Sequence, residues 1–138
     1  MIVQKFGGTS VANAERLRNV ARIITDTYQR GNRVVAVLSA QGDTTDDLIE
    51  KAREINPSAS KREMDMLLST GEQISCSLCA MAIEAMGYPV VSLTGWQAGF
   101  RTNSGYGNSR IKRVMTERVR DELENKRRIV IVTGLRRL

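Results

Sequence analysis

The chain of 138 residues contains no histidine, and this absence excludes several kinds of chemistry. Serine–histidine and cysteine–histidine catalysis within the chain both need an imidazole as general base. The only cysteines are Cys76 and Cys79. A C-x-x-C pair can be redox-active or form half of a zinc site. Here no second pair and no histidine completes a site, and the pair lies within a long helical pattern. We therefore predict that both cysteines are small buried residues.

Long apolar runs are also absent, and none approaches the roughly 18 residues of a membrane helix. A lysine and two glycines arrive before any apolar segment typical of a signal peptide, so we expect a cytoplasmic protein. Aromatic residues make up only 4%, and no RNP-like motif or zinc ligand set accompanies the net charge of +6. The favoured interpretation of the basic residues is solvated helix faces and a basic tail, and nucleic-acid binding ranks last among the alternatives.

Four short runs rich in β-branched residues predict strands. Two of them, "VVAVL" and "IVIV", are continuously apolar, which is typical of strands covered on both faces in a parallel sheet. The length fits one domain with one core. The predicted strands are Ile2–Phe6, Arg33–Ser39, Pro89–Leu93 and Arg128–Thr133.

Helical patterns lie between these runs and predict an α/β fold. The first helix should end at Gly31, and Ser60-Lys-Arg-Glu63 resembles a capping box that starts a long amphipathic helix. Another helix is predicted from about Thr116 to Asn125. The apolar positions of the first helix are Leu17, Val20, Ala21, Ile24 and Tyr28, and those of the long helix are Leu67, Ile74, Leu78 and Ala82.

Each predicted strand is followed by a small loop that contains glycine and often hydroxyl side chains. In an open parallel sheet the carboxyl ends of the strands meet at one edge, where ligands bind. We therefore expect these loops to form one site. They are Gly7–Ser10, Ser39–Asp47, Thr94–Gly99 and Gly134.

The first loop, "KFGGTS", has the character of an anion site. Gly7 and Gly8 lack a Cβ, so a ligand can approach their backbone N–H groups, which form a nest for anions. Lys5 adds a positive charge that can stabilise a transferring phosphoryl group, and Thr9 and Ser10 add donors. The segment is not a P-loop, because its lysine precedes the glycines. The alternative is a lysine that ends an edge strand before a tight turn.

Three other features leave alternatives open. Thr44-x-x-Asp47 resembles a capping box with Asp46 and Asp47 in the first helical turn, and an ordinary acidic helix start is favoured over a site that tolerates an ammonium group. Glu72 lies in an apolar helical pattern, where a solvated face and a ligand contact are equally compatible with the sequence. The long polar segment after Leu93, through "TGWQAGFRTNSGYGNSR", is either a functional loop or a plain surface excursion.

Four segments in order resemble successive motifs of the aspartokinases, members of the amino acid kinase family: "VQKFGGTSV", "SAQGDTTDDL", "REMDMLLSTGEQIS" and "SLTGWQAGF". The resemblance covers residues 1 to about 134. It implies a three-layer α/β/α sandwich with a mainly parallel sheet. It also implies transfer of the ATP γ-phosphoryl group to the side-chain carboxylate of L-aspartate, giving 4-phospho-L-aspartate, the first step toward lysine, threonine and methionine.

The resemblance also assigns roles to residues of this chain. Lys5, Phe6, Gly7 and Gly8, followed by Thr9 and Ser10, would bind the ATP phosphates, and Lys5 would neutralise charge on the transferring group. Ser39 and Thr45 would contact aspartate, and Glu72 would hold its amino group. Mg²⁺ would accompany ATP, and no metal ligand is assigned to the chain itself. Aspartate is the nucleophile, so no covalent enzyme intermediate is needed.

This sequence departs from the family pattern in two places. Tyr106 stands where many relatives have histidine, although no role above depends on that position. From Leu135 onward the likeness fails, so residues 1–138 are expected to be the N-terminal portion of an amino acid kinase domain, from a frameshifted or truncated gene or a gene fragment. The rest of the kinase domain and the regulatory ACT domains would be missing. The full-length enzyme is expected to be a homo-oligomer.

Two functions are compatible with this expectation. The chain is an aspartate kinase by descent with little or no activity alone, or it is a non-catalytic fragment that binds ATP or aspartate and needs a C-terminal partner.

Overall fold

Strands and helices alternate along the computed structural model, which describes residues 1–99 and 116–134. The predicted element order is confirmed, and the strand bounds differ from the predicted ones by one residue at most. The elements are β1 (Ile2–Phe6), α1 (Ala14–Gln29), β2 (Val34–Leu38), α2 (Gly42–Ile55), α3 (Lys61–Ala85), β3 (Val90–Leu93), α5 (Glu117–Arg120), the π-helical turn η2 (Asp121–Asn125) and β4 (Ile129–Thr133).

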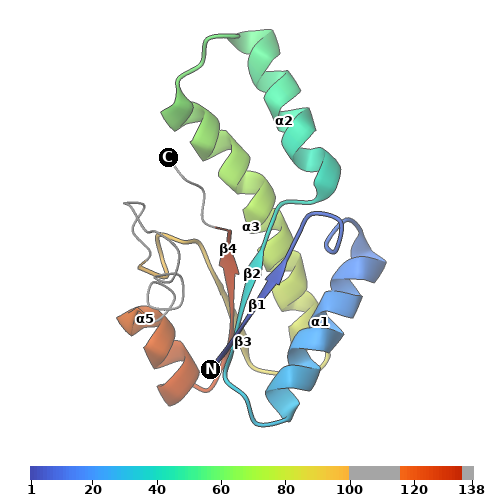
Figure 1. Ribbon diagram of the computed structural model, residues 1–138, viewed down its shortest axis with the longest axis vertical. Coiled ribbons are helices and arrows are strands. Elements are labelled where there is room, and N and C mark those ends of the chain that lie inside the picture. The colour runs from blue at the N-terminus through green and yellow to red at the C-terminus, as the bar shows by residue number, and fades with distance from the viewer. Residues whose placement is uncertain (100–115, 135–138) are drawn as a thin grey trace.

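The four strands form one parallel sheet in the order β1-β2-β4-β3. Lys5 on the edge strand β1 pairs with Val37, and Ala36 pairs with Ile131 in the centre of the sheet. Helices α1 and α3 cover one face, while α5 and η2 lie on the other (Figure 1). The predicted α/β class with a parallel sheet between helical layers is therefore confirmed.

The two central strands explain the continuously apolar runs in the sequence. Alternate residues of β2 and β4 point to opposite faces of the sheet, and both faces are packed. One core lies under α1 and α3 and takes Val34, Ala36, Leu38, Ile129 and Ile131 from the sheet. The second lies under α5 and η2 and takes Val35, Val130, Val132 and Leu93.

The start of α3 agrees with the predicted cap at Ser60, the start of α2 differs from the prediction, and α1 begins after an asparagine cap that was not predicted. The Oδ1 of Asn13 accepts the N–H of Arg16 at 2.9 Å at the start of α1, and the Oγ of Ser60 accepts the N–H of Glu63 at 3.3 Å at the start of α3. The predicted capping box at Thr44 is wrong, because α2 already begins at Gly42 with Gln41 as its N-cap residue. Asp43, rather than Asp46 or Asp47, is the acidic residue of its first turn.

Helix α3 buries a different face from the one that its strongest apolar positions suggest. Its buried residues follow the series Leu68, Glu72, Ser75, Cys76, Cys79 and Ile83, which confirms the prediction for both cysteines. Ile74 and Leu78 lie on the exposed side. By length and composition alone α3 could cross a membrane, and 44% of its most apolar 18-residue window is buried inside the protein.

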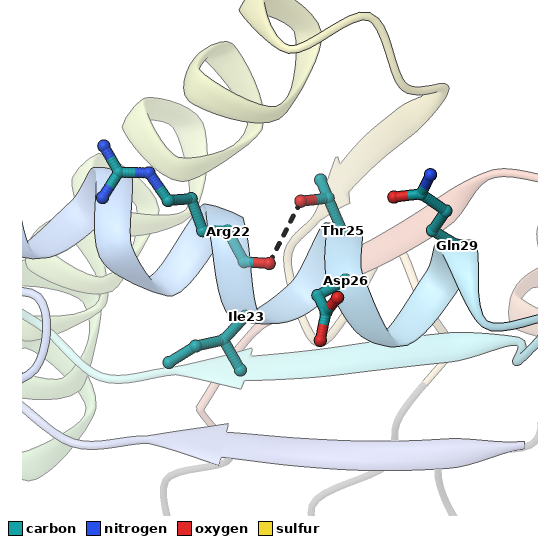
Figure 2. A pocket seen from close by; sticks show the side chains of 5 residues that line it. All are labelled: Arg22, Ile23, Thr25, Asp26 and Gln29. Carbon is teal, nitrogen blue, oxygen red and sulfur yellow. Dashed lines mark hydrogen bonds between the residues drawn. The ribbon is translucent and has the colours of Figure 1, made fainter.

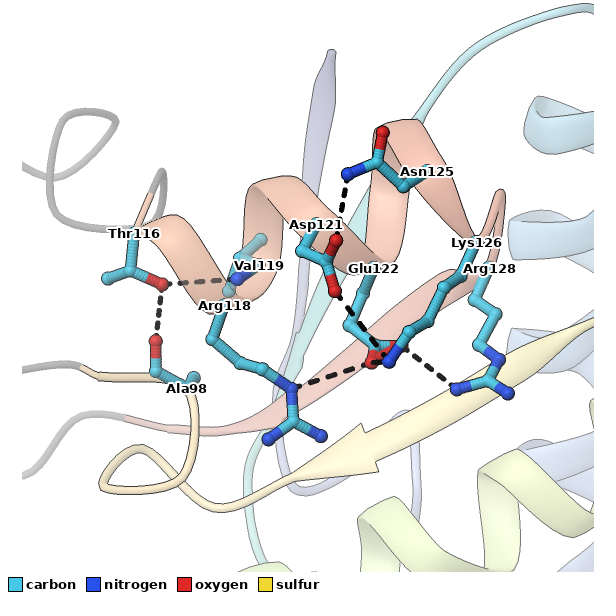
Figure 3. A network of polar contacts seen from close by, with 9 residues as sticks. All are labelled: Ala98, Thr116, Arg118, Val119, Asp121, Glu122, Asn125, Lys126 and Arg128. Atoms are coloured by element: carbon cyan, nitrogen blue, oxygen red, sulfur yellow. Dashed lines mark hydrogen bonds and ion pairs between the residues drawn. The ribbon is translucent and has the colours of Figure 1, made fainter.

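A network of charged side chains fastens η2 to the sheet. Glu122 is fully buried, and its carboxylate accepts from Lys126 Nζ at 3.0 Å and Arg128 Nη1 at 3.1 Å, with Arg118 Nε at 3.4 Å (Figure 3). The three cations are about half exposed. Burial by itself would raise the pKa of Glu122, but the hydrogen bonds from Lys126 and Arg128 outweigh it and hold that pKa below its ordinary value.

The lowered pKa of Glu122 predicts an acid-labile contribution to stability. The contribution is complete above the pKa of the unfolded carboxyl and is lost as the pH falls through the lower pKa of the folded state. Glu122→Gln should lower the free energy of unfolding at neutral pH by about 1 to 3 kcal/mol, since it removes the buried negative charge that pairs with Arg118, Lys126 and Arg128. The variant should also lose less stability between neutral and acid pH than the wild type.

Urea titrations at several pH values measure this difference in stability, with the exposed Glu84→Gln as control. Parallel pH profiles for Glu122→Gln and wild type would contradict it.

Candidate functional site at the carboxyl edge of the sheet

The carboxyl ends of the strands are linked to one another by hydrogen bonds just beyond the sheet. The N–H of Ser39 donates to the carbonyl of Phe6 at 3.1 Å, and the N–H of Gly134 donates to the carbonyl of Leu38 at 3.0 Å. The N–H of Gly95 donates to the Oγ1 of Thr133 at 2.9 Å. The loops after all four strands therefore adjoin at one edge, as the parallel topology requires.

The glycine loop after β1 is a tight turn. The N–H of Ser10 donates to the carbonyl of Gly7 at 3.1 Å and closes the turn. Arg16, in the first turn of α1, donates from Nη1 to the carbonyl of Thr9 at 2.9 Å. Among the residues that the structure describes, no acceptor pairs with the backbone N–H of Gly8 or Thr9. Successive N–H groups of this kind suit an anion.

The two glycines of this loop have different surroundings. A Cβ on Gly8 would lie 3.1 Å from the carbonyl oxygen of Ala40 and 3.3 Å from the Cα of Gly42, so the β1 loop packs directly on the start of α2. A Cβ on Gly7 would meet nothing within 4 Å. Gly8 is thus needed for packing, whereas the open space at Gly7 leaves room for a ligand.

This difference predicts opposite outcomes for two matched substitutions. Gly8→Ala should lower the free energy of unfolding by about 1 to 3 kcal/mol, because the added methyl group presses on backbone atoms that cannot rotate away. Gly7→Ala should change it by less than about 0.5 kcal/mol, as is usual at a surface position. Urea unfolding of both variants provides the comparison. Equal losses of stability would show that Gly7 is also a packing residue.

Lys5 lies at the end of β1 with its side chain exposed, next to this loop. Phe6, its neighbour, packs into the core under α1, so the alternation of the strand directs Lys5 toward the opposite face. Ser39 and Thr45 are both half-buried, the first directly after β2 and the second within α2. The structure thus places Lys5, the glycine loop and Ser39 on neighbouring strand ends.

Glu72 comes to the same edge from α3. It is only 6% exposed, so the interpretation of a solvated face is wrong. A Cβ on Gly134 would lie 3.7 Å from the Oε1 of Glu72, which puts this carboxylate beside the end of β4. Gly71 allows α3 to pack closely on the segment after β2, since a Cβ there would lie 3.0 Å from the Cβ of Ala40 and 3.2 Å from the Cγ2 of Thr44. A buried carboxyl group therefore lies beside the end of β4, next to the loop after β2.

The thiols of Cys76 and Cys79, on the same helix as Glu72, are expected to be unreactive. Burial raises the pKa of Cys76 to about 12, with smaller contributions from Cys79 and Glu72, and burial also raises the pKa of Cys79 to about 12. A thiol with such a pKa stays protonated near neutral pH and is a poor nucleophile. This agrees with a structural role for both cysteines.

Arg16 and Gly71 hold the site together from outside the loops, and neither is predicted as a site residue. Arg16 has no motif of its own, and only its position three residues after a helix-capping asparagine suggests a link to the glycine loop. Gly71 has no signal beyond its place next to Glu72. Tyr106 and most of the long segment after Leu93 lie outside the described residues.

A hollow of about 460 Å³ is found elsewhere, on the C-terminal half of α1 (Figure 2). One helix supplies its lining, and the hydroxyl of Thr25 is already engaged with the carbonyl of Arg22 at 3.2 Å. Because α1 runs away from the glycine loop, this hollow lies toward the opposite edge of the sheet. Its lining residues are Arg22, Ile23, Thr25, Asp26 and Gln29.

Comparison with known proteins identifies relatives for nearly the whole chain. The model of the amino acid kinase family matches residues 1–137. The chain is 54% identical to the aspartokinase of Geobacillus stearothermophilus and 52% identical to aspartokinase 2 of Bacillus subtilis, each over 134 residues and 97% of the chain. It spans only 33% of the length of each of these relatives.

Solved structures of aspartate kinases also superpose on this chain. The aspartate kinase from Synechocystis superposes with a TM-score of 0.77 at 42% identity, covering 97% of this chain and 22% of that protein. E. coli aspartokinase III, solved in complex with aspartate and ADP in the R-state, superposes with a TM-score of 0.69 at 21% identity and supports the fold alone. The superposition covers 97% of this chain and 40% of that protein.

Proposed function

We infer that this chain, which belongs to the amino acid kinase family, supplies the part of an aspartate kinase that binds the ATP phosphates and aspartate. The whole enzyme would transfer the γ-phosphoryl group of ATP to the side-chain carboxylate of L-aspartate. The product, 4-phospho-L-aspartate, would enter lysine, threonine and methionine biosynthesis in the cytoplasm. The observation that carries the proposal is the placement of a lysine and glycine loop at one strand end and a buried carboxylate two strands away at the same edge.

The two ends of the site suit the two substrates. Near β1, the ammonium of Lys5 and the N–H groups of Gly8 and Thr9 would hold the phosphates, while the open side of Gly7 gives them room. Mg²⁺ would arrive with ATP, bound to phosphate oxygens. Near β4, the carboxylate of Glu72 would hold the ammonium of aspartate. Ser39, which follows β2 between β1 and β4, and Thr45 of α2 would contact the rest of the aspartate.

The chemistry requires no covalent intermediate. An oxygen of the aspartate side-chain carboxylate attacks the γ-phosphorus, and the bond from that phosphorus to the bridging oxygen of ADP breaks. Lys5 would stabilise the negative charge on the transferring group, which is the main contribution that a protein makes to phosphoryl transfer. E. coli aspartokinase III, a neighbour in fold, was solved with aspartate and ADP, which agrees with a site for both substrates.

A chimera tests the proposal. Residues 1–134 of this chain would replace the segment that they match in the Geobacillus stearothermophilus aspartokinase, and aspartyl phosphate formed from ATP and L-aspartate would be trapped as the hydroxamate. We expect turnover within about tenfold of the parent enzyme. Loss of turnover in a folded chimera would contradict the proposal.

The second candidate is a module that binds ATP or aspartate without turnover. The one observation in its favour is that the proposed phosphate-binding and aspartate-binding residues all lie within this short chain. The 138-residue chain alone should form little or no hydroxamate, since it spans 33% of its relative. Titration calorimetry of the chain with ATP and with L-aspartate, with and without the remaining segment of the relative, separates the candidates. Hydroxamate formed by the chain alone would contradict the expected inactivity.

A further inference from the structure

The side chain of Arg16 ties the first turn of α1 back to the glycine loop. The backbone of this residue is itself fixed, because its N–H donates to the Oδ1 of Asn13 at 2.9 Å and the next residue, Leu17, is buried. From there the Nη1 of Arg16 donates to the carbonyl of Thr9 at 2.9 Å. The side chain is exposed, so this hydrogen bond, rather than apolar packing, accounts for its orientation.

The bond from Arg16 acts on a chain of linked peptide units. The carbonyl of Thr9 and the N–H of Ser10 belong to one planar unit, which turns as a rigid body. Arg16 holds the carbonyl end of this unit, and the N–H end donates to the carbonyl of Gly7 at 3.1 Å. The carbonyl of Gly7 shares the next linked unit with the N–H of Gly8. That unit is trans, so the N–H of Gly8 points away from Ser10. The orientation of this N–H therefore depends, through two peptide units, on Arg16.

The loop needs such a restraint because it contains two adjacent glycines. Glycine has access to more backbone conformations than any other residue, and fixing a glycine costs more conformational entropy. A Cβ on Gly7 would meet nothing within 4 Å, so no neighbouring atoms confine the loop at that position. Donors that are held in place before a ligand arrives bind it more tightly, since the ligand does not have to order them.

The guanidinium of Arg16 also keeps its full charge. Its acceptor is a neutral carbonyl, and no ion pair among the described residues includes Arg16. Lys5 comes just before the glycine loop and Arg16 contacts it from the far side, so two positive charges flank the loop. A guanidinium has five N–H donors, and a group of this kind next to backbone N–H groups favours a phosphate over a neutral ligand.

We propose that Arg16 is a positioning residue for the triphosphate of ATP. It holds the Thr9–Ser10 peptide, and through it the N–H of Gly8, in the orientation that receives the phosphates, and it adds a positive charge beside them. This inference rests on the proposed function and assigns to the phosphate end a residue that lies outside the loop. Because Glu72 lies two strands away at the end of β4, the effect of Arg16 should be confined to the nucleotide.

Substitutions in the chimera described above test this role. Arg16→Ala should weaken the binding of ATP, measured by titration calorimetry with MgATP, by about tenfold, the usual loss for a hydrogen bond from a charged group. The KM for ATP should rise in the same proportion, while the KM for L-aspartate stays within about twofold. Arg18→Ala removes another exposed arginine of α1 and should change neither constant. Arg16→Lys keeps the charge and should bind ATP more tightly than Arg16→Ala but less tightly than the unsubstituted chimera.

Three results would overturn the role of Arg16: an unchanged affinity for ATP in Arg16→Ala, an equal loss in Arg18→Ala, or equal rises in the KM of both substrates. In a chimera that turns over, each of them leaves the proposed function intact. A folded chimera without turnover contradicts the proposed function instead, and the calorimetric comparison still decides the role of Arg16. An unsubstituted chimera that binds no ATP would overturn both. If Arg16→Ala does not fold, Arg16→Lys and Arg18→Lys provide the same comparison, and equal affinities of these two variants for ATP would overturn the role.

Discussion

Lys5→Ala in the chimera should lower kcat by about 100-fold or more, the usual loss when one charge contact to a transition state is removed. The side chain is exposed at the end of β1, so its removal should leave the fold intact. The KM for aspartate should change much less than kcat, because the lysine acts on the transferring phosphoryl group. Steady-state hydroxamate assays measure both constants.

The matched control for this substitution is Lys51→Ala, which removes an exposed lysine on α2. Its kcat should stay within about twofold of the unsubstituted chimera, as expected for a surface change outside the site. An unchanged kcat for Lys5→Ala would mean that Lys5 only ends the edge strand before a tight turn, the alternative that its sequence context leaves open.

Glu72→Gln should weaken the handling of aspartate selectively. A hydrogen bond to a charged group contributes about 1.5 to 3 kcal/mol, so kcat/KM for L-aspartate should fall by about 10- to 100-fold. The KM for ATP should stay nearly constant, because Glu72 lies beside the ends of β2 and β4 and not at the glycine loop. Glutamine keeps the volume of the side chain and limits any change in packing.

Succinate, which is aspartate without the ammonium group, makes this prediction sharper. The unsubstituted chimera should prefer L-aspartate strongly, and Glu72→Gln should lose most of that preference, since the charge that recognises the ammonium is gone. Glu84→Gln, on the exposed side near the end of α3, is the control and should keep the preference. A Glu72→Gln variant that still prefers aspartate to the same degree would remove Glu72 from the substrate site.

The sheet could be predicted from the sequence because its two central strands are apolar on both faces. The runs at Val34–Leu38 and Ile129–Thr133 admit few other structures, and the parallel order then brings the loops to one edge. The position of Lys5 beside the glycine loop follows directly, since neighbours in sequence remain neighbours at a strand end.

The start of α2 and the burial of Glu72 could not be predicted, because both depend on contacts between distant segments. Gly8 and Gly71 let the β1 loop and α3 come within van der Waals distance of Ala40 and Gly42, and this close packing fixes the helix start two residues before Thr44. The same packing buries Glu72 at the sheet edge and turns Ile74 outward. A local pattern of apolar residues contains no information on which face of α3 the sheet will cover.

The measurement that tests the central claim most directly is a crystal structure of the chimera with L-aspartate and a non-hydrolysable ATP analogue. We predict that the Nζ of Lys5 and the N–H groups of Gly8 and Thr9 contact the phosphates, while the carboxylate of Glu72 accepts a hydrogen bond from the aspartate ammonium. Phosphates bound away from the glycine loop, or an aspartate whose ammonium is held by other groups, would contradict the assignment of the two ends of this site.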